Sequence, residues 1–433
     1  MTILLIGQVT LHWGRMEFGN MGNYYIIEPF IRCLHTQFPN AEIKTTLQMS
    51  REFCEREKVQ VLPMEYYYSF KENDLEMARA DLQEAKNYLK GNYESPSGYV
   101  KEVLQADLVI DLSGDMWGDN ADLAGKDRFE VGLIRDYIPQ ILGKPTFMLA
   151  GSPGPFEKIG CLEFAHQVFS GFDLVTNREK ISRQILMDYG FDVRNVADCA
   201  CPSFLFEPNR NVDYSKIVCD KFSQKDRPVV GLILCGWNFK EVPFSKWPRE
   251  DKEYEIFITA IENFVNNHDA NLCLISHSNG FPIPPAHFEL QHGRDYFVVE
   301  HLYQLLRERN IVKNTSITLV NEVLDVWDTK GIIGKFDMLI SGRVHGAIAG
   351  LSQCVPTVIV DYGQEPKAHK LKGFAEIAGV SEYVADPNNL GDMESKMDKC
   401  WDKCAEIRQK LRERMPIVFE SAMQNFEMVK EKV

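Results

Sequence analysis

Three residues whose side chains and backbone could bind and protonate an anion stand next to one another at 343–346. Arg343 and His345 are separated by one valine, and Gly346 follows directly. A guanidinium group binds phosphate or carboxylate through paired hydrogen bonds, and an imidazole can donate a proton near neutral pH. Glycine allows a ligand to approach the backbone closely. Arg343 or His345 alone would more often be an ion-pair partner or a polar core residue, but the three together indicate a site for an anionic substrate.

The surrounding sequence predicts how these residues are held. Residues 336–340 and 357–362 are apolar runs, typical of strands that are buried on both faces of a parallel sheet. Small and apolar residues at 344–353 predict a helix that starts directly after Gly342. The first turn of a helix carries unpaired N–H groups and the positive end of the helix dipole, so it favours anions. Lys367 begins the next predicted helix and could add a cation at the same end of the sheet.

A loop rich in glycine and asparagine near the N-terminus is the second candidate. Residues 3–6 predict the first strand, and the loop after it contains the sequence GNMGN at 19–23, directly before a predicted helix. Ligands bind at the carboxyl ends of strands in open α/β sheets, so we select Asn20, Gly22 and Asn23 as candidate substrate contacts. The alternative is a turn that needs residues tolerant of positive φ. The loop lacks the G-x-G-x-x-G spacing of a dinucleotide site.

Polar side chains follow two further predicted strands in the N-terminal half. Asp115 and Asp119 come after the strand at 106–111, where they could bind hydroxyl groups of a sugar or cap the next helix. Arg178 follows the strand at 173–176, where it could be a second anion-binding cation or the partner of a nearby carboxylate. Both pairs of alternatives stay open.

The strand predicted at 271–276 is followed by His277 and Asn279, which we include as candidate ligand contacts. A single histidine in such a position is more often structural, so this alternative also stays open. Because the carboxyl ends of parallel strands meet at one edge of a sheet, we expect these residues to face the same end as Arg343.

The length of the chain, 433 residues, exceeds that of one ordinary core and predicts two domains. Strand-like and helical runs alternate in both halves, which predicts parallel sheets covered by helices. The segment 208–228 is polar and charged, so we expect a linker there. We therefore predict a Rossmann-like domain at 1–207, a second Rossmann-like domain at 229–392 and a helical segment at 393–433.

The composition excludes several classes of protein. A formal net charge of −14 without a compensating basic stretch argues against a nucleic-acid-binding protein. The 11 cysteines lack the spacing of a zinc site or a disulfide framework, which favours a reducing compartment and predicts no metal. No apolar run approaches the length of roughly 18 residues that a membrane span needs, and no basic leader precedes the first strand, so we expect a cytoplasmic protein.

The region around Arg343 resembles the polysaccharide pyruvyltransferase family. It contains an Arg-x-His motif after a buried strand, a helix of small residues, the pair Val355-Pro356, the strand that ends at Tyr362, and then Lys367. Four residues separate Tyr362 from Lys367, a small departure from the spacing of the family.

Weaker matches to the same family extend the resemblance over about residues 1–385. They are the Gly-Asn segment of the first loop, the Gly-Pro-rich loop at 150–156, and Arg178 followed by Ser182. The resemblance implies the GT-B fold, in which two Rossmann-like, doubly wound α/β domains face each other across a cleft. In this chain a long helix is expected to follow them at the C-terminus.

The resemblance also implies an activity, the transfer of pyruvate from phosphoenolpyruvate onto a sugar diol to form a ketal on a polysaccharide or exopolysaccharide. Arg343, Arg178 and Lys367 would bind the phosphate and carboxylate of the donor. His345 would donate a proton to the methylene carbon of the donor, and Asp115 is the candidate base for the acceptor hydroxyl. The partners would be phosphoenolpyruvate and a sugar or glycan acceptor, which can be lipid-linked, and no metal or other cofactor is required.

Two alternatives compete with this function. One is a nucleotide-sugar-dependent glycosyltransferase on the same fold, in which Arg343 and Lys367 would hold a diphosphate. The other is a non-catalytic partner protein in glycan assembly.

Overall fold

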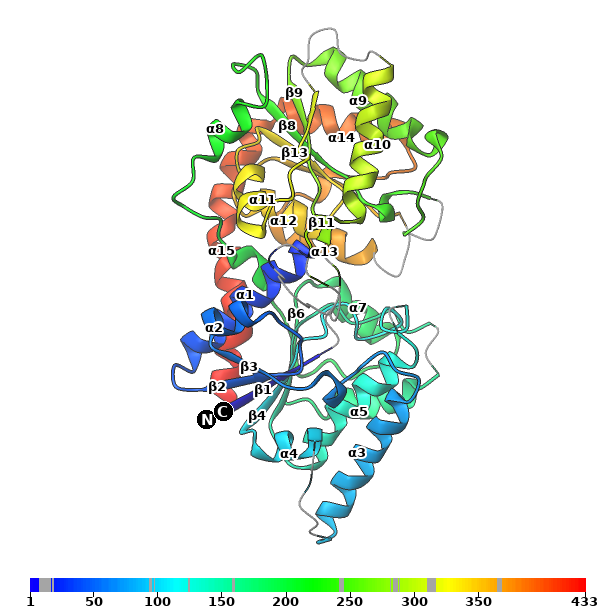
Figure 1. Cartoon of the computed structure of the whole chain (residues 1–433), viewed down its shortest axis with the longest axis vertical. Helices are drawn as coiled ribbons and strands as arrows, with labels where there is room; N and C mark the ends of the chain where they lie inside the picture. Colours follow the sequence, from blue (N-terminus) through cyan, green and yellow to red (C-terminus); the bar gives the residue numbers. More distant parts are fainter. Residues whose placement is uncertain are drawn as a thin grey trace. The chain divides into compact units, whose positions relative to one another are not determined.

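The computed structural model of the chain describes residues 1–7, 17, 19–92, 96, 98–123, 125–157, 160–240, 245–280, 282, 287, 289–309, 317–363 and 368–433. Contacts within the chain divide it into two compact units, each built around its own parallel sheet (Figure 1). Unit 1 comprises Met1–Arg15, Glu28–Pro202 and Ser421–Val433, and unit 2 comprises Met16–Ile27 and Ser203–Glu420. Two helices, α1 (Met21–Gln37) and α15 (Cys404–Lys432), therefore contribute residues to both units.

Unit 1 contains a seven-stranded parallel sheet in the order β3-β2-β1-β4-β5-β6-β7. Its strands are β1 (Thr2–Ile6), β2 (Glu42–Thr45), β3 (Val59–Val61), β4 (Leu108–Asp111), β5 (Thr146–Gly151), β6 (Leu174–Asn177) and β7 (Val196–Asp198). The helices that lie entirely in this unit are α2 (Arg51–Glu57), α3 (Asp74–Leu89), α4 (Gly98–Gln105), α5 (Arg128–Ile141), α6 (Leu162–Ser170) and α7 (Ile181–Asp188). The strand order reverses direction between β1 and β4, which is where ligands bind in doubly wound sheets.

Unit 2 contains a six-stranded parallel sheet in the order β12-β9-β8-β13-β14-β15 and a short hairpin. The strands are β8 (Val229–Ile233), β9 (Asn271–Leu274), β12 (Ile317–Leu319), β13 (Met338–Ser341), β14 (Thr357–Val360) and β15 (Val384–Ala385), and the hairpin pairs β10 (Asn279–Gly280) with β11 (Gln291–His292). The helices are α8 (Tyr214–Cys219), α9 (Glu255–Asn267), α10 (Arg294–Glu308), α11 (Val326–Ile333), α12 (Val344–Leu351), α13 (Ala368–Ala378) and α14 (Leu390–Asp402).

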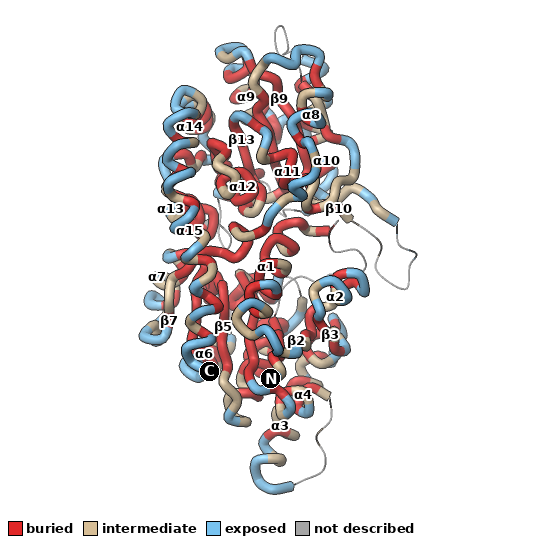
Figure 2. The backbone as a smooth tube through the Cα atoms, turned by 90° about the vertical axis from the view of Figure 1, so that its left-hand side faces the viewer, coloured by how far each residue is buried: buried red, intermediate tan, exposed pale blue. Residues whose placement is uncertain are grey.

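The central strands are buried along their whole length because helices cover both faces of each sheet. Every residue of β4, β5 and β6 in unit 1 and of β8, β13 and β14 in unit 2 is buried (Figure 2). This explains why these strands appear in the sequence as continuous apolar runs rather than as alternating ones. Packing is tight where β8 meets β13, since a Cβ atom on Gly231 would lie 2.1 Å from the ring of Phe336.

The long C-terminal helix α15 ends in the core of unit 1. The side chain of Asn425 is fully buried, donates to the carbonyl of Ala200 at 3.0 Å and accepts from the hydroxyl of Thr176 at 2.6 Å. Phe426 packs edge-on against Phe30 of α1 at 4.9 Å between ring centroids. The helix is therefore fixed to β6 and to the second half of α1 by both polar and aromatic contacts.

The polar segment 208–228, which we predicted to be a linker, lies within unit 2. It contains α8, where Tyr214 is buried and donates to the Asp328 carboxylate of α11 at 2.9 Å. A Cβ atom on Gly331 would lie 2.2 Å from the same ring, so the tyrosine packs directly on α11. The polar character of this segment thus reflects a helix on the surface of unit 2.

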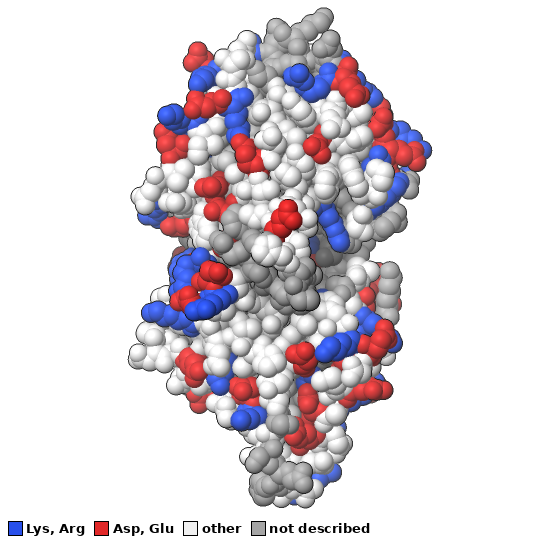
Figure 3. All heavy atoms as spheres, in the orientation of Figure 1, with Lys and Arg blue, Asp and Glu red and all other residues white. Residues whose placement is uncertain are grey.

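Charged side chains of both signs are mixed over the surface. On the face drawn in Figure 3, basic and acidic groups of each unit alternate and form no continuous basic stripe. Within the described residues, no helix combines the length and the apolar character that crossing a bilayer requires.

Candidate active site

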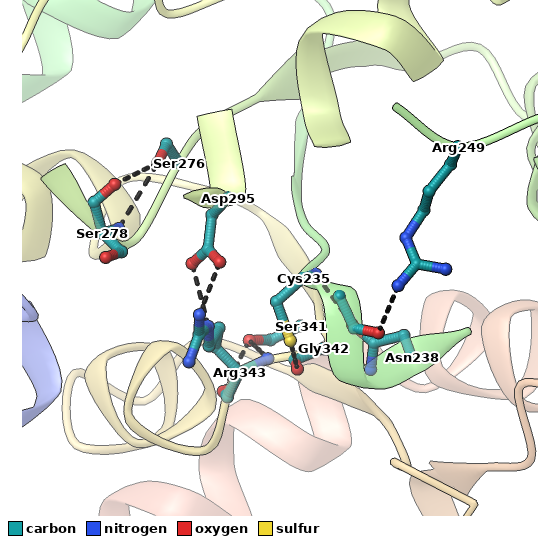
Figure 4. Close-up of polar contacts among 10 residues, drawn as sticks. Cys235, Asn238, Arg249, Ser276, Ser278, Asp295, Ser341, Gly342 and Arg343 are labelled. Atoms are coloured by element: carbon teal, nitrogen blue, oxygen red, sulfur yellow. Dashed lines mark hydrogen bonds and ion pairs between the residues drawn. The ribbon is translucent and has the colours of Figure 1, made fainter. Parts of the chain in front are cut away.

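The turn between β13 and α12 is held in one conformation by its own polar groups. The Ser341 hydroxyl donates to the carbonyl of Arg343 at 2.9 Å and accepts from the Arg343 N–H at 3.3 Å (Figure 4). The N–H of Gly342 donates to the carbonyl of Ile233 at 2.7 Å, and a Cβ atom at Gly342 would lie 2.1 Å from the Asn238 amide oxygen. Only glycine fits at position 342, so Arg343 always leaves the sheet at the same point.

The guanidinium group of Arg343 is bound by a carboxylate that sequence analysis did not select. Asp295, in the first turn of α10, is fully buried and accepts from Nε at 2.8 Å and from Nη2 at 2.5 Å (Figure 4). Burial of Arg343 opposes its charge, but the nearby Asp295 carboxylate favours it, and the pKa of Arg343 ends above its ordinary value.

One edge of the guanidinium remains available. Asp295 binds Nε and Nη2, and the Arg343 side chain is 23% exposed. Because Asp295 fixes the plane of the guanidinium, the remaining N–H groups have a defined direction. Arg343 is thus a fixed cation that can still bind an anion.

The first turn of α1 meets the first turn of α12 within unit 2. A Cβ atom on Gly22 would lie 2.5 Å from Nδ1 of His345, so glycine is needed for this contact. The carbonyl of Asn20 accepts from the N–H of Asn23 at 3.0 Å and so begins the helix. Neither α1 nor α12 has an acidic residue in its first turn, so their positive ends are not neutralised locally.

The loop after β9 joins the same group of residues. Asn20 pairs with Ser278 in an antiparallel bridge, and the N–H of Asn279 donates to the carbonyl of Gly19 at 3.2 Å. The Asn279 side-chain amide donates to the carbonyl of Leu324 at 2.5 Å, which ties this loop to the segment before α11. The backbone of the loop is thereby fixed, and the Asn279 side chain has a structural partner.

His277 lies in this loop as a neutral imidazole. It is 2% exposed, and its Nε2 atom has no hydrogen-bond partner within the described part of the chain. Burial, then the positive charges of Arg343 and Lys330, lower the pKa of His277 to about 3. Its ring lies edge-on to Tyr25, with 5.4 Å between centroids. His277 can therefore offer a hydrogen bond to a ligand, but it carries no proton to donate as an acid near neutral pH.

Gly346, a further predicted site residue, has a structural role. At Gly346, a Cβ atom would lie 2.8 Å from the Ser341 hydroxyl and 3.0 Å from a methyl group of Ile233. This glycine is therefore required for packing α12 onto the sheet. Lys367 lies outside the described residues.

The N-terminal candidates Arg178 and Asp115 come together in unit 1, at the ends of β4, β5 and β6. Arg178 is 2% exposed, and its Nε donates to the Ser152 hydroxyl at 2.9 Å. Its Nη2 lies 3.8 Å from the Asp115 carboxylate, and a Cβ atom on Gly114 would lie 3.6 Å from Nη1. The loops that follow β4, β5 and β6 thus meet around the buried guanidinium group of Arg178.

Ser182 and Asp119 have local structural partners. The hydroxyl of Ser182 donates to the Glu179 carboxylate, whose other oxygen accepts from the Ser182 N–H at 3.1 Å. Asp119 accepts from the N–H of Glu157 at 2.9 Å and so joins two loops, rather than capping α5, which starts after Asp127.

A pair of buried carboxyl groups lies beneath the loop that carries Asp115. Asp111 accepts from the N–H and the hydroxyl of Ser113 at 2.9 and 2.7 Å, and Asp136 accepts from the indole N–H of Trp117 at 3.2 Å. Burial raises the pKa of Asp111 to about 7, and burial together with the charge of Asp111 raises the pKa of Asp136 well above its ordinary value. The pair therefore keeps a proton at neutral pH and holds both ends of the loop.

Among the described residues, no group of three His, Cys, Asp or Glu side chains is arranged to hold a metal ion.

The chain is similar in sequence to known proteins. A family model described as polysaccharide pyruvyl transferase matches residues 20–364. The amylovoran biosynthesis protein AmsJ of Erwinia amylovora is 22% identical over 428 residues, which cover 95% of this chain and 94% of AmsJ.

Solved structures resemble the chain over its whole length. A glycosyltransferase from Rickettsia africae has a TM-score of 0.60 at 12% identity, covering 100% of this chain and 98% of that one. Anabaena HepE in complex with UDP and glucose has a TM-score of 0.57 at 14% identity, covering 100% and 99%. At such identities the likeness concerns the fold alone. It confirms the predicted GT-B-like α/β class with a long C-terminal helix.

Proposed function

The chain belongs to the polysaccharide pyruvyl transferase family, and from this premise we propose that it transfers pyruvate from phosphoenolpyruvate to a sugar diol. It is a transferase of polysaccharide biosynthesis, like the family that it matches over residues 20–364. The product would be a cyclic ketal, in which one carbon of pyruvate joins two oxygens of the same sugar. The acceptor would be part of a polysaccharide or of its lipid-linked precursor.

The observation that carries this proposal is the meeting of two helix N-termini beside a fixed cation in unit 2. The contact between Gly22 and His345 brings the first turns of α1 and α12 together, and Arg343 precedes α12 directly. Phosphoenolpyruvate carries a phosphate ester and a carboxylate on the same carbon, C2. Two positive helix ends and one guanidinium edge suit such a compact, multiply charged donor.

The reaction needs an acid close to the methylene carbon of the donor. Protonation of that carbon gives an oxocarbenium-like centre at C2, and a sugar hydroxyl adds there. Phosphate then leaves with its bonding electrons, and the second hydroxyl adds at the same carbon. One of the two hydroxyl protons balances the proton taken up by the methyl group, and the other leaves with the phosphate. We assign the acid to His345, which lies where the first turns of α1 and α12 meet.

Unit 1 supplies candidates for the acceptor. Asp115 lies at a loop between strand ends and has 20% of its side chain exposed, so it can accept a proton from a hydroxyl group. The Nη2 atom of Arg178 lies 3.8 Å from its carboxylate. The assignment of Asp115 as base is part of the proposal.

A ligand-dependent stability measurement tests the donor. We expect phosphoenolpyruvate to raise the thermal midpoint, by an amount equivalent to about 2.7 kcal/mol at a concentration of 100 times Kd. UDP-glucose and GDP-mannose at equal concentration should not do so. A shift with a nucleotide sugar alone would favour the glycosyltransferase alternative, which rests on the fold only. No shift with any of these ligands would favour a non-catalytic partner protein.

A further inference from the structure

Two aromatic side chains of unit 2, Trp247 and Phe297, have exposed rings that contact each other. They are 45% and 40% exposed, their ring centroids lie 5.6 Å apart and their planes differ by 31°. In the described part of the chain, Phe70 is a further aromatic residue with such exposure, but its ring packs against the buried Tyr68. We call Trp247 and Phe297 the aromatic platform.

The aromatic platform lies at the same edge of the sheet as Arg343. Trp247 belongs to the connection that follows β8, and Phe297 belongs to the first turn of α10, in the connection that follows β9. Arg343 follows β13, which is hydrogen-bonded to β8 in a parallel register. Asp295, two residues before Phe297, binds Arg343 directly. Residues two apart on a helix point in nearly opposite directions, so Asp295 faces Arg343 in the core and Phe297 faces solvent on the other side of α10.

Further ring side chains contact the two rings of the platform. Trp247 contacts the ring of His301 at 6.1 Å, and His301 is fixed by a 2.8 Å hydrogen bond to Asp251. Phe297 contacts Tyr296 at 6.0 Å between centroids. A ring held in this way offers a flat apolar surface with little loss of conformational entropy on binding.

The charges around the platform are mutually paired. Lys246 binds Glu253 at 2.7 Å, and Lys252 binds Glu250 at 2.7 Å. Asp251 pairs with His301 at 2.8 Å and still has 68% of its side chain exposed. An anionic membrane surface needs an excess of cations, and the paired charges named above supply none.

A sugar ring does match this surface. One face of a pyranose presents C–H groups that pack on aromatic rings, while its edge presents hydroxyl groups for carboxylates such as Asp251. We propose that the aromatic platform binds a sugar unit of the acceptor glycan outside the diol that reacts. This inference rests on the proposed function, because it assigns the bound sugar unit to the acceptor glycan.

Binding of oligosaccharides tests the platform without requiring pyruvyl transfer. The probes are galactose-, glucose- and mannose-based oligosaccharides of one to four units, titrated calorimetrically into the full chain. We expect the tightest-binding oligosaccharide to lose about tenfold in affinity in Trp247→Ala and in Phe297→Ala, because half-exposed rings would become buried on binding. Trp247→Phe should retain most of the affinity. Phe70→Ala, an exposed aromatic residue of unit 1, is the matched control and should bind like the wild type.

The results separate the two proposals. If phosphoenolpyruvate neither binds nor reacts but oligosaccharide affinity still depends on Trp247 and Phe297, the platform stands and the pyruvyltransferase proposal fails. If pyruvyl transfer occurs and both alanine variants bind the oligosaccharides as the wild type does, the platform proposal is wrong. It is also wrong if no member of the panel binds the wild-type chain.

Discussion

The buried carboxyl pair of unit 1 predicts an unusual dependence of stability on pH. In an unfolded chain both aspartates ionise near pH 4, whereas burial raises the pKa of Asp111 to about 7 and that of Asp136 well above its ordinary value. The folded protein therefore keeps a proton that the unfolded chain has released. Rising pH between about 4 and 7 then favours unfolding, by about 1.4 kcal/mol per pH unit for each proton that the folded pair retains.

The Asp136→Asn substitution should remove this dependence. An amide at 136 can still accept the indole N–H of Trp117 and can donate an N–H toward Asp111, so it takes the place of the retained proton. Asp111 would then ionise at a lower pH, stabilised by the two hydrogen bonds from Ser113. Relative to the wild type, the variant should gain up to about 1.4 kcal/mol per pH unit between pH 5 and 7. The neighbouring phenols Tyr67 and Tyr99 stay neutral in this range, because burial raises their pKa values.

Urea denaturation at pH 5, 6 and 7 measures this change. Glu72→Gln, which replaces a carboxylate with 90% of its side chain exposed, is the control and should follow the wild type at each pH. If the difference in unfolding free energy between Asp136→Asn and the wild type is the same at all three pH values, the buried pair does not retain a proton on folding.

Three further predictions concern unit 2. Arg343→Ala should lower the unfolding free energy by about 3–5 kcal/mol, because it leaves the Asp295 carboxylate buried and unpaired, and adding Asp295→Asn should recover much of that loss in urea denaturation. His345→Asn should leave donor affinity nearly unchanged and reduce turnover about 10²–10⁴-fold in a phosphate-release assay, whereas an intact rate would contradict its role as acid. Gly22→Ala should weaken phosphoenolpyruvate binding in calorimetry, since its methyl group would lie 2.5 Å from Nδ1 of His345, while Gly160→Ala, which has open space, should bind normally.

Much of the local structure could be predicted from the sequence. The strands predicted at 336–340 and 357–362 are observed as β13 (Met338–Ser341) and β14 (Thr357–Val360), and the predicted helix begins at Val344 as α12. These predictions rest on local signals, namely continuous apolar runs and a glycine at a tight turn. The same signals placed Arg343 at the beginning of the helix, which is where it is found.

The partners of the candidate residues could not be predicted in this way. Asp295 lies 48 residues from Arg343, and in the sequence it is one of many acidic residues in the first turn of a helix. Asp111 and Asp136 likewise meet only because α5 packs against the end of β4. A carboxylate that neutralises a cation and one that is solvated have the same local pattern, so only the tertiary structure distinguishes them.

We also did not predict from the sequence which residues belong to which unit. The polar composition of 208–228 suggested a boundary, yet α8 packs on α11 through Tyr214. Residues 16–27 and 421–433 each belong to the unit that is remote from them in the chain. Pro29 of α1 and Pro416 of α15 lie close to these points, but each helix continues past its proline.

Helix α1, which the two units share, supplies part of the proposed donor site. Its first turn supplies Gly22 and the backbone beside His345, although most of unit 2 is formed by residues 203–420. The N-terminal segment is fixed there by the bridge between Asn20 and Ser278, and by the hydrogen bond from Asn279 to Gly19. A fragment that starts at residue 203 would keep Arg343 and its partner Asp295 but would lack one of the two helix N-termini. The proposed anion site therefore includes the N-terminal segment, and a cut at the midpoint of the sequence would remove one of the two helix N-termini that we assign to donor binding.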